Sequence, residues 1–152
     1  GKDLTGTILT GANLSNSILT DVDLSGKDLT GTILTGANLS NSILNDVDLS
    51  GKDLTGANFS GDLTGVIFTN ANLTNAMLEN ANLIDVNLES VNLSNSVLRN
   101  ALLVDANLSN SILTEADFSN AILTGAILTG SDLENAVLTN AILNCIGHPV
   151  CG

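Results

Sequence analysis

The sequence predicts an all-β solenoid, in which short extended segments joined by corners wind the chain around one core. Two observations predict this class. Leu or Phe recurs every five residues, and Ala, Ser or Val stands two positions before it in 23 of 29 units. The two residues that follow are usually of the Thr-Gly or Ser-Asn type, which favours turns. Each unit therefore predicts a short extended segment and a corner.

The five-residue period runs from Leu4 to Leu143 and includes 26 Leu and three Phe. Such a period fits neither an α-helix, at about 3.6 residues per turn, nor a long strand, at about two. In an extended segment, the Leu and the small residue two positions earlier point to the same side. One unit cannot bury its Leu alone, so the units must stack. The expected core includes Leu4, Leu29, Leu54, Phe59, Leu63, Phe68, Leu103, Phe118 and Leu143.

The units "ANLSN", "ANLTN", "ADFSN" and "SDLEN" resemble the pentapeptide repeat family, whose motif is A-(D/N)-L-x-x. The resemblance covers residues 2–144. It implies a right-handed quadrilateral parallel β-helix with four pentapeptides per coil, and hence about seven coils. It also implies that the Leu and the small residue point inward. We expect a single repeat domain over 1–144 and a C-terminal cap or tail over 145–152.

Two irregularities interrupt the repeat. Residues 26–50 duplicate residues 1–25 except for one position, and a third copy begins at Gly51. A step of 25 on a four-sided coil moves each copy one face further round. The second irregularity is a four-residue step through 60–62, where Gly61 must serve as both corner and small residue. Phe59 and Phe68 flank this step, and we expect them to fill a continuous rod with a local pinch.

The duplication places Lys2, Lys27 and Lys52 at inward positions of the repeat. An unpaired ammonium group is too costly to bury in its charged form. We therefore expect a local bulge, or a lysine stem that lines the core while its amine reaches out at a corner. The expected acceptors are the carboxylates of Asp23, Asp28, Asp48 and Asp53.

On a four-sided coil, outward residues 20 positions apart share a face. Leu102, Ile122 and Ile142 then lie on one face in consecutive coils, and Ile84 and Val104 extend the same surface. A contiguous exposed apolar patch marks an interaction site. We expect either a homodimer through the C-terminal half or a surface for another protein. The alternative is that outward Ile and Val simply suit extended segments.

The tail "CIGHPVCG" departs from the repeat and contains the only Pro, the only His and both Cys. We expect a cap for the open end of the solenoid. A Cys145–Cys151 disulfide needs an oxidising compartment, such as the periplasm or the thylakoid lumen; without it the cytoplasm is the default. Two Cys and one His are too few ligands for a metal site, and His148 has no nucleophile arranged near it.

Composition narrows the function. The net charge of −12 argues against direct nucleic-acid binding and against anionic membranes. The sequence has no phosphate loop, metal cluster or nucleophile with a base, so we expect no enzyme and no cofactor. It favours a non-catalytic structural or protein-interaction solenoid, with an unknown partner and role. The resemblance also implies an alternative, an acidic DNA mimic that binds DNA gyrase or another DNA-binding protein. A passive scaffold fits as well, and cyanobacteria carry many members of this family.

Overall fold

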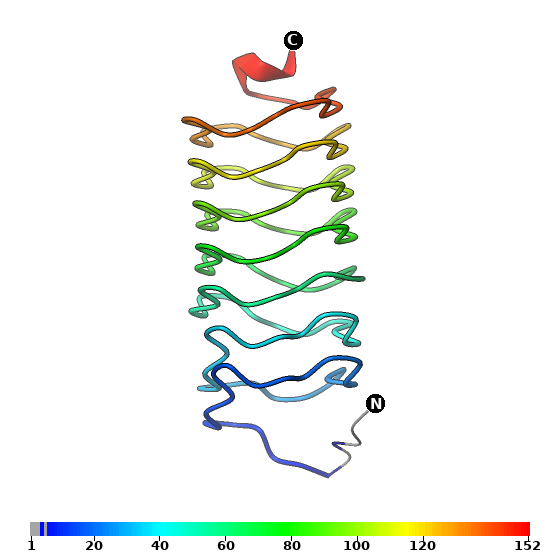
Figure 1. Cartoon of the computed structure of the whole chain (residues 1–152), viewed down its shortest axis with the longest axis vertical. Helices are drawn as coiled ribbons and strands as arrows, with labels where there is room; N and C mark the ends of the chain where they lie inside the picture. The colour runs from blue at the N-terminus through cyan, green and yellow to red at the C-terminus, as the bar shows by residue number, and fades with distance from the viewer. Residues whose placement is uncertain (1–3, 5) are drawn as a thin grey trace.

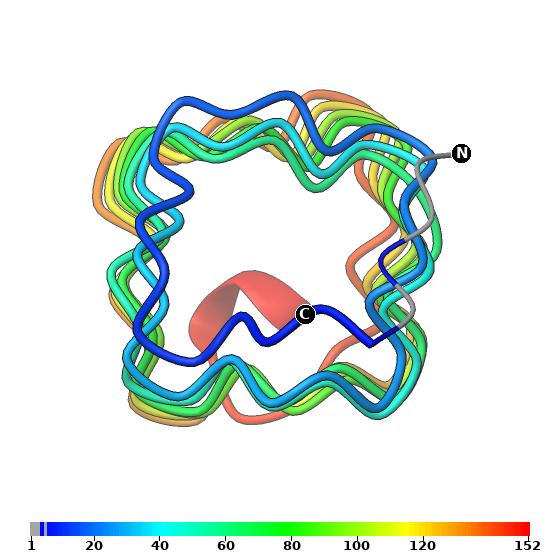
Figure 2. The ribbon, with the colours of Figure 1, turned by 90° about the horizontal axis from the view of Figure 1, so that it is seen from below.

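The chain winds into a rod of stacked coils with a four-sided cross-section (Figures 1 and 2). This computed structural model describes residue 4 and residues 6–152. Among the residues described, neighbouring coils pair through single-residue parallel β-bridges. Most of these bridges join residues 20 positions apart. Four pentapeptides therefore complete one coil, because the bridged residue recurs once in each unit.

The bridges form four ladders, one on each face of the rod, and those of the first and third faces are interrupted between Ile33 and Asp53 and between Ile43 and Asp62. The first face carries Asn13, Ile33, Asp53, Asn72, Asn92, Ile112 and Asp132. The second face carries Ile18, Asn38, Asn58, Met77, Val97, Asp117 and Val137. The third face carries Asp23, Ile43, Asp62, Asn82, Leu102, Ile122 and Ile142. The fourth face carries Asp48, Ile67, Asn87, Asn107, Ile127 and Ile146.

Most corners share one local structure, which the unit 72–76 illustrates. The Ala76 N–H donates to the Leu73 carbonyl over 3.0 Å, and Asn75 between them has a left-handed φ of 58°. A type II turn requires such a positive φ at its third residue, which Gly and Asn adopt at least cost. The Asn72 side chain accepts hydrogen bonds from the Thr74 N–H and hydroxyl groups, at 3.2 and 2.6 Å. These bonds explain the Asn-Leu-Thr-Asn pattern of the sequence.

The interior is a continuous stack of the Leu and Phe side chains with small residues between them. Most of the side chains expected in the core are buried: Leu29, Leu54, Phe59, Leu63, Phe68, Leu103 and Phe118. Each buried Leu contributes about 1.5–3 kcal/mol before entropy is subtracted. Leu4 and Leu143 are only partly buried, because they lie near the two ends of the rod.

The rod continues through the four-residue step after Phe59. Gly61 absorbs the missing residue with a φ of 137°, and its carbonyl accepts the Asn82 N–H over 2.8 Å. The rings of Phe59 and Phe68 meet edge to face, with centroids 5.5 Å apart and planes at 88°. Across this step the bridged residues are 19 positions apart, as for Asp48 and Ile67.

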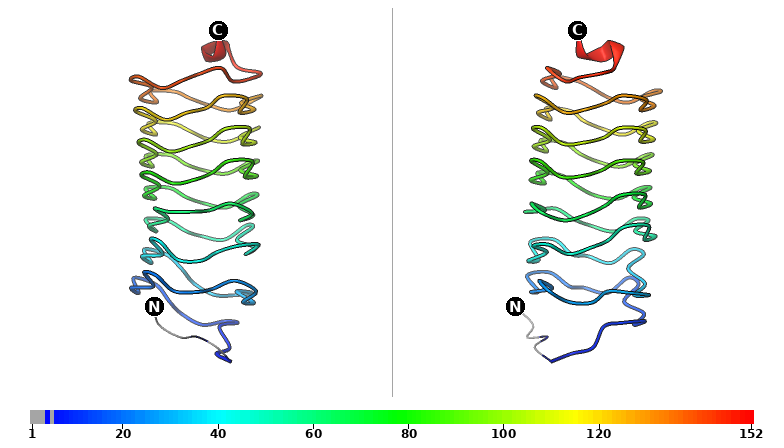
Figure 3. Two further views of the ribbon diagram at one scale, coloured as in Figure 1. Left: turned by 90° about the vertical axis from the view of Figure 1, so that its right-hand side faces the viewer. Right: turned by 180° about the vertical axis from the view of Figure 1, so that it is seen from behind.

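The C-terminal tail lies across the end of the rod (Figures 2 and 3). Its 3-10 helix η1 spans Pro149–Cys151, and the Val150 N–H donates to the His148 Nδ1 over 3.2 Å. A disulfide joins Cys145 to Cys151, whose Cα atoms are 4.9 Å apart. Among the residues described, no helix has the length and apolar character needed to cross a membrane.

Candidate functional site

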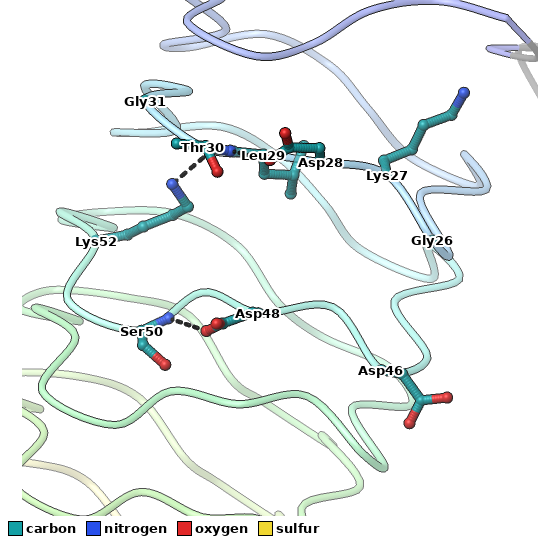
Figure 4. Close-up of a pocket in the computed structure, with 10 residues that line it drawn as sticks. All are labelled: Gly26, Lys27, Asp28, Leu29, Thr30, Gly31, Asp46, Asp48, Ser50 and Lys52. Carbon is teal, nitrogen blue, oxygen red and sulfur yellow. Dashed lines mark hydrogen bonds between the residues drawn. The ribbon is translucent and has the colours of Figure 1, made fainter.

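A cleft of about 640 Å³ opens between two neighbouring coils in the N-terminal part of the rod (Figure 4). Segment 26–31 forms one edge and segment 46–52 forms the other. The cleft is lined by Gly26, Lys27, Asp28, Leu29, Thr30, Gly31, Asp46, Asp48, Ser50 and Lys52. It is an interruption of the regular stacking and thus a candidate binding site.

The cleft lies where hydrogen bonds between coils are missing. In the next pair of coils, the Leu49 N–H donates to the Ile67 carbonyl over 2.8 Å, and the Ile67 N–H donates to the Val47 carbonyl over 3.1 Å. The equivalent N–H groups of Leu29 and Asp48 form no hydrogen bond within the described part of the chain. Both edges of the cleft therefore present open backbone groups.

The same two coils remain joined on the second face. Asn38 bridges Asn58, and the Asn41 N–H donates to the Ser60 carbonyl over 2.8 Å. Two smaller hollows extend the separation on either side of this junction. One, of about 440 Å³, is lined by residues within 31–35 and 50–53; the other, of about 430 Å³, lies near Asp62. The N-terminal coils are thus attached to the rest of the rod mainly along one face.

Like charge opposes closure of the cleft. Asp28 and Asp48 are 20 positions apart on the fourth face, so closing the coils would set the two carboxylates directly opposite each other. Opposed like charges destabilise pairing between extended segments. Asp48 does pair with the following coil, where the facing residue is Ile67.

Lys27 and Lys52 occupy inward positions beside the cleft and are half-buried. The Lys52 Nζ donates to the Leu29 carbonyl over 2.7 Å, across the open gap. The Lys27 Nζ points away from the cleft and donates to the Leu4 and Thr7 carbonyls, at 2.7 and 3.4 Å (Figure 4). The acceptors are corner carbonyls and not the carboxylates expected from the sequence, because an inward stem meets carbonyls while the Asp side chains point outward. Lys2 lies outside the described residues.

The carboxylates of Asp28 and Asp48 are held in their charged form. Hydrogen bonds from Thr30 lower the pKa of Asp28, and the positive charge of Lys52 adds to this effect. Hydrogen bonds from Ser50, together with Lys52, lower the pKa of Asp48 in the same way. The cleft therefore combines three acidic side chains with the ammonium group of Lys52, which already has a backbone acceptor.

The structure brings Leu102, Ile122 and Ile142 together on the third face, where they are bridged in consecutive coils. We call these three residues the apolar strip. Leu102 is 36% exposed, Ile142 is 47% exposed, and Ile122 is half-buried. Ile84 and Val104 are half-buried beside the strip. The five residues expected to share a surface thus lie on the third face or at its edge.

The remaining candidate residues serve the cap. The His148 ring accepts the Val150 N–H, and both Cys are in the disulfide. In the region that the structure describes, no group of three or more His, Cys, Asp or Glu is placed to hold a metal ion. The two surface features that could bind another molecule are the apolar strip and the open backbone edges of the cleft. Sequence reasoning missed the cleft, although counting by 20 sets Asp28 above Asp48.

Comparison with known proteins defines the class to which this repeat solenoid belongs. The model for pentapeptide repeats matches residues 3–36, 28–61, 62–95, 91–130 and 118–145, in eight copies. The chain belongs to the pentapeptide repeat family, as the sequence units predicted. Known structures of this family are right-handed quadrilateral β-helices.

Among solved structures, the chain is similar to the pentapeptide repeat protein Rfr23 from the cyanobacterium Cyanothece 51142. The two share 28% sequence identity with a TM-score of 0.52, over 91% of this chain and 90% of that one. Two structures of QnrB1, a plasmid-mediated fluoroquinolone resistance protein, match with 24% and 26% identity and TM-scores of 0.48 and 0.49. They cover 90% and 84% of this chain, and 73% and 84% of theirs. No curated protein matches the sequence.

Proposed function

We propose that this chain is a non-catalytic interaction rod of about seven coils that associates with a second copy of itself through the apolar strip. One observation carries the proposal. Leu102, Ile122 and Ile142 are bridged in consecutive coils, and the aliphatic side chains of Leu102 and Ile142 are exposed on that face. A contiguous apolar patch favours association, whereas isolated apolar residues do not require it.

The charge distribution favours a second copy as the partner. Two chains with a net charge of −12 repel each other unless they meet where acids are absent. After Asp62 the ladder of the third face contains only Asn82 and the three residues of the apolar strip. Asp85 and Asp105, which follow this face in the chain, lie at a corner and not on the ladder.

The opposite edge of this face carries pairs of Asn side chains, together with Glu79 and with Arg99, which is paired with Asp117. The Asn100 side chain donates to Asn80 over 3.2 Å, and Asn140 donates to Asn120 over 3.3 Å. A stable interface buries about 800 Å² per partner, and the three side chains of the apolar strip cover a smaller area than that. We therefore expect a weak dimer whose formation depends on concentration. Added salt should strengthen it, because salt screens the repulsion between the acidic rods.

The test is sedimentation of a variant that carries Leu102→Asn and Ile122→Asn. Asn is preferable to Asp, because stacked Asn87 and Asn107 pair in this rod at 3.3 Å whereas Asp28 does not pair with Asp48. The variant should remain monomeric at concentrations where the unmodified chain dimerises. A matched control makes the same change at exposed aliphatics on other faces, Ile67→Asn with Ile112→Asn. Dimerisation of the strip variant, or its loss in the control, would exclude the strip as the interface.

The disulfide between Cys145 and Cys151 supports an oxidising compartment for this rod, such as the periplasm or the thylakoid lumen. Thiol titration of protein taken directly from its native compartment measures whether Cys145 and Cys151 are oxidised there. Free thiols at both positions would instead support the cytoplasm.

The acidic alternative, a mimic of DNA that binds gyrase, has less support from the geometry. A mimic needs its negative charges in a continuous stripe. The ladder carboxylates lie on different faces: Asp132 is on the first, Asp117 on the second, Asp62 on the third and Asp48 on the fourth. A gyrase supercoiling assay separates the two functions, because the interaction rod proposed here should not inhibit supercoiling at micromolar concentration.

A further inference from the structure

We propose that the cleft between segments 26–31 and 46–52 accepts an extended peptide strand from a different protein, and that this strand places a basic side chain between Asp28 and Asp48. This site is separate from the apolar strip and does not depend on dimerisation. Three properties of the cleft support it: its open backbone edges, its facing carboxylates and the Leu29 side chain that lines it.

The backbone edges provide the binding surface. The N–H groups of Leu29 and Gly31 on one edge, and of Asp48 on the other, form no hydrogen bond among the residues described. A strand between them would supply the missing partners on both sides, as in other cases of strand addition to a sheet edge. The cleft volume of about 640 Å³ lies within the range of about 300–1,000 Å³ that is usual for binding sites.

The carboxylates provide selectivity. Asp28 and Asp48 lie on the two facing edges of the cleft (Figure 4), and the outward side chain of an inserted strand would lie between them. Both carboxylates are charged at neutral pH, so Arg or Lys is favoured at that position and Asp or Glu is opposed. The rod already contains one pair of this type: the Arg99 Nε donates to the Asp117 Oδ2 of the next coil over 2.6 Å.

One apolar side chain in the cleft defines the rest of the strand. Leu29 lines the cleft, so the inserted strand should follow its basic residue with Leu and precede it with a small residue. A second copy of this chain does not provide such a strand. In its own units the position before the Leu or Phe carries Asp, Asn, Met or an aliphatic residue, and never Lys or Arg. The strand therefore comes from a different protein.

The experiment uses two synthetic peptides, acetyl-SGARLTGT-amide and the matched acetyl-SGADLTGT-amide, with the full chain. Calorimetry measures affinity, and amide hydrogen exchange locates binding. The Arg peptide should bind at least about tenfold more tightly than the Asp peptide. It should also slow the exchange of the Leu29, Gly31 and Asp48 amides.

The matched protein variant is Asp28→Asn with Asp48→Asn. Asn preserves the local turn, because Asn13 accepts the Ser15 N–H as Asp28 accepts the Thr30 N–H. This variant should fold normally and bind the Arg peptide about 5- to 20-fold more weakly than the unmodified chain. The two peptides should then bind with similar affinity.

Four outcomes would overturn the proposal. The first is undetectable binding of the Arg peptide at millimolar concentration. The second is equal binding of both peptides to the unmodified chain. The third is protection of the Leu29 and Asp48 amides in the free protein equal to that of Leu49, which would mean that the coils close in solution. The fourth is protection that rises with protein concentration without peptide, which would assign the cleft to a second copy.

Discussion

Replacing Gly61 by Ala perturbs the point where the repeat loses one residue. Gly61 has a φ of 137°, a conformation that costs other residues about 1–3 kcal/mol. An added Cβ would lie 3.1 Å from the Asn41 N atom and 3.2 Å from its Cα, both backbone atoms. Relief requires movement of Asn41, whose N–H donates to the Ser60 carbonyl over 2.8 Å. Weakening that bond adds about 1 kcal/mol, so the expected loss of unfolding free energy is about 2–4 kcal/mol.

The control is Gly56→Ala, at an ordinary corner. Gly56 has a φ of 67°, and an added Cβ would meet no atom within 4 Å. Only the left-handed penalty of about 1–2 kcal/mol applies there. Urea unfolding followed by far-UV circular dichroism measures both variants, because the chain has no Trp or Tyr. If the Gly61 variant loses no more stability than the Gly56 variant, the account of the four-residue step is wrong.

Three further predictions concern the core, the cap and the carboxylates. Leu88→Ala in the fully buried core should cost about 3–5 kcal/mol in urea unfolding, and Leu138→Ala near the C-terminal end less than half of that; equal losses would contradict the stacked core. Replacing Cys145 and Cys151 by Ser should cost no more than about 2 kcal/mol, and faster amide exchange should be confined to the last coil. Hydrogen bonds from Thr55 lower the pKa of Asp53 in the folded state. Its contribution to stability is therefore present above about pH 4 and is lost as the pH falls through the folded pKa. Between pH 6 and pH 3, the free energy of unfolding should fall less steeply in the Asp53→Asn variant than in the unmodified chain. An equal slope in the two proteins would contradict this role of Asp53.

Much of the fold follows from the sequence, because the repeat specifies one environment in every unit. Side-chain alternation predicts that Leu54 and Phe118 face the interior, and both are buried. The family predicted from the ANLSN-type units is confirmed by the pentapeptide repeat match. The one-residue deletion at 60–62 is also visible in the sequence, although the φ that accommodates it is not.

The cleft was not predicted, because it depends on contacts between coils, of which the sequence shows only that Asp28 stands 20 positions before Asp48. The sequence marked Lys27 and Lys52 as unusual, but their partners depend on the direction in which an inward side chain leaves the corner. The inward Thr32 hydroxyl likewise donates to the Leu9 carbonyl of the preceding coil over 2.8 Å, whereas the inward Ser96 hydroxyl donates to the Leu93 carbonyl of its own coil over 2.7 Å. The 25-residue duplication places its copies on different faces of the rod. The residues that face each other in neighbouring coils are instead set by the 20-residue step.

Sedimentation equilibrium of the unmodified chain over a concentration series tests the proposed self-association most directly. The proposal predicts an average mass that rises from 15.5 kDa toward twice that value as the concentration increases. The rise should be steeper at high salt, because the association is apolar and opposed by the net negative charge. A mass that stays at 15.5 kDa at every concentration and salt level would contradict it.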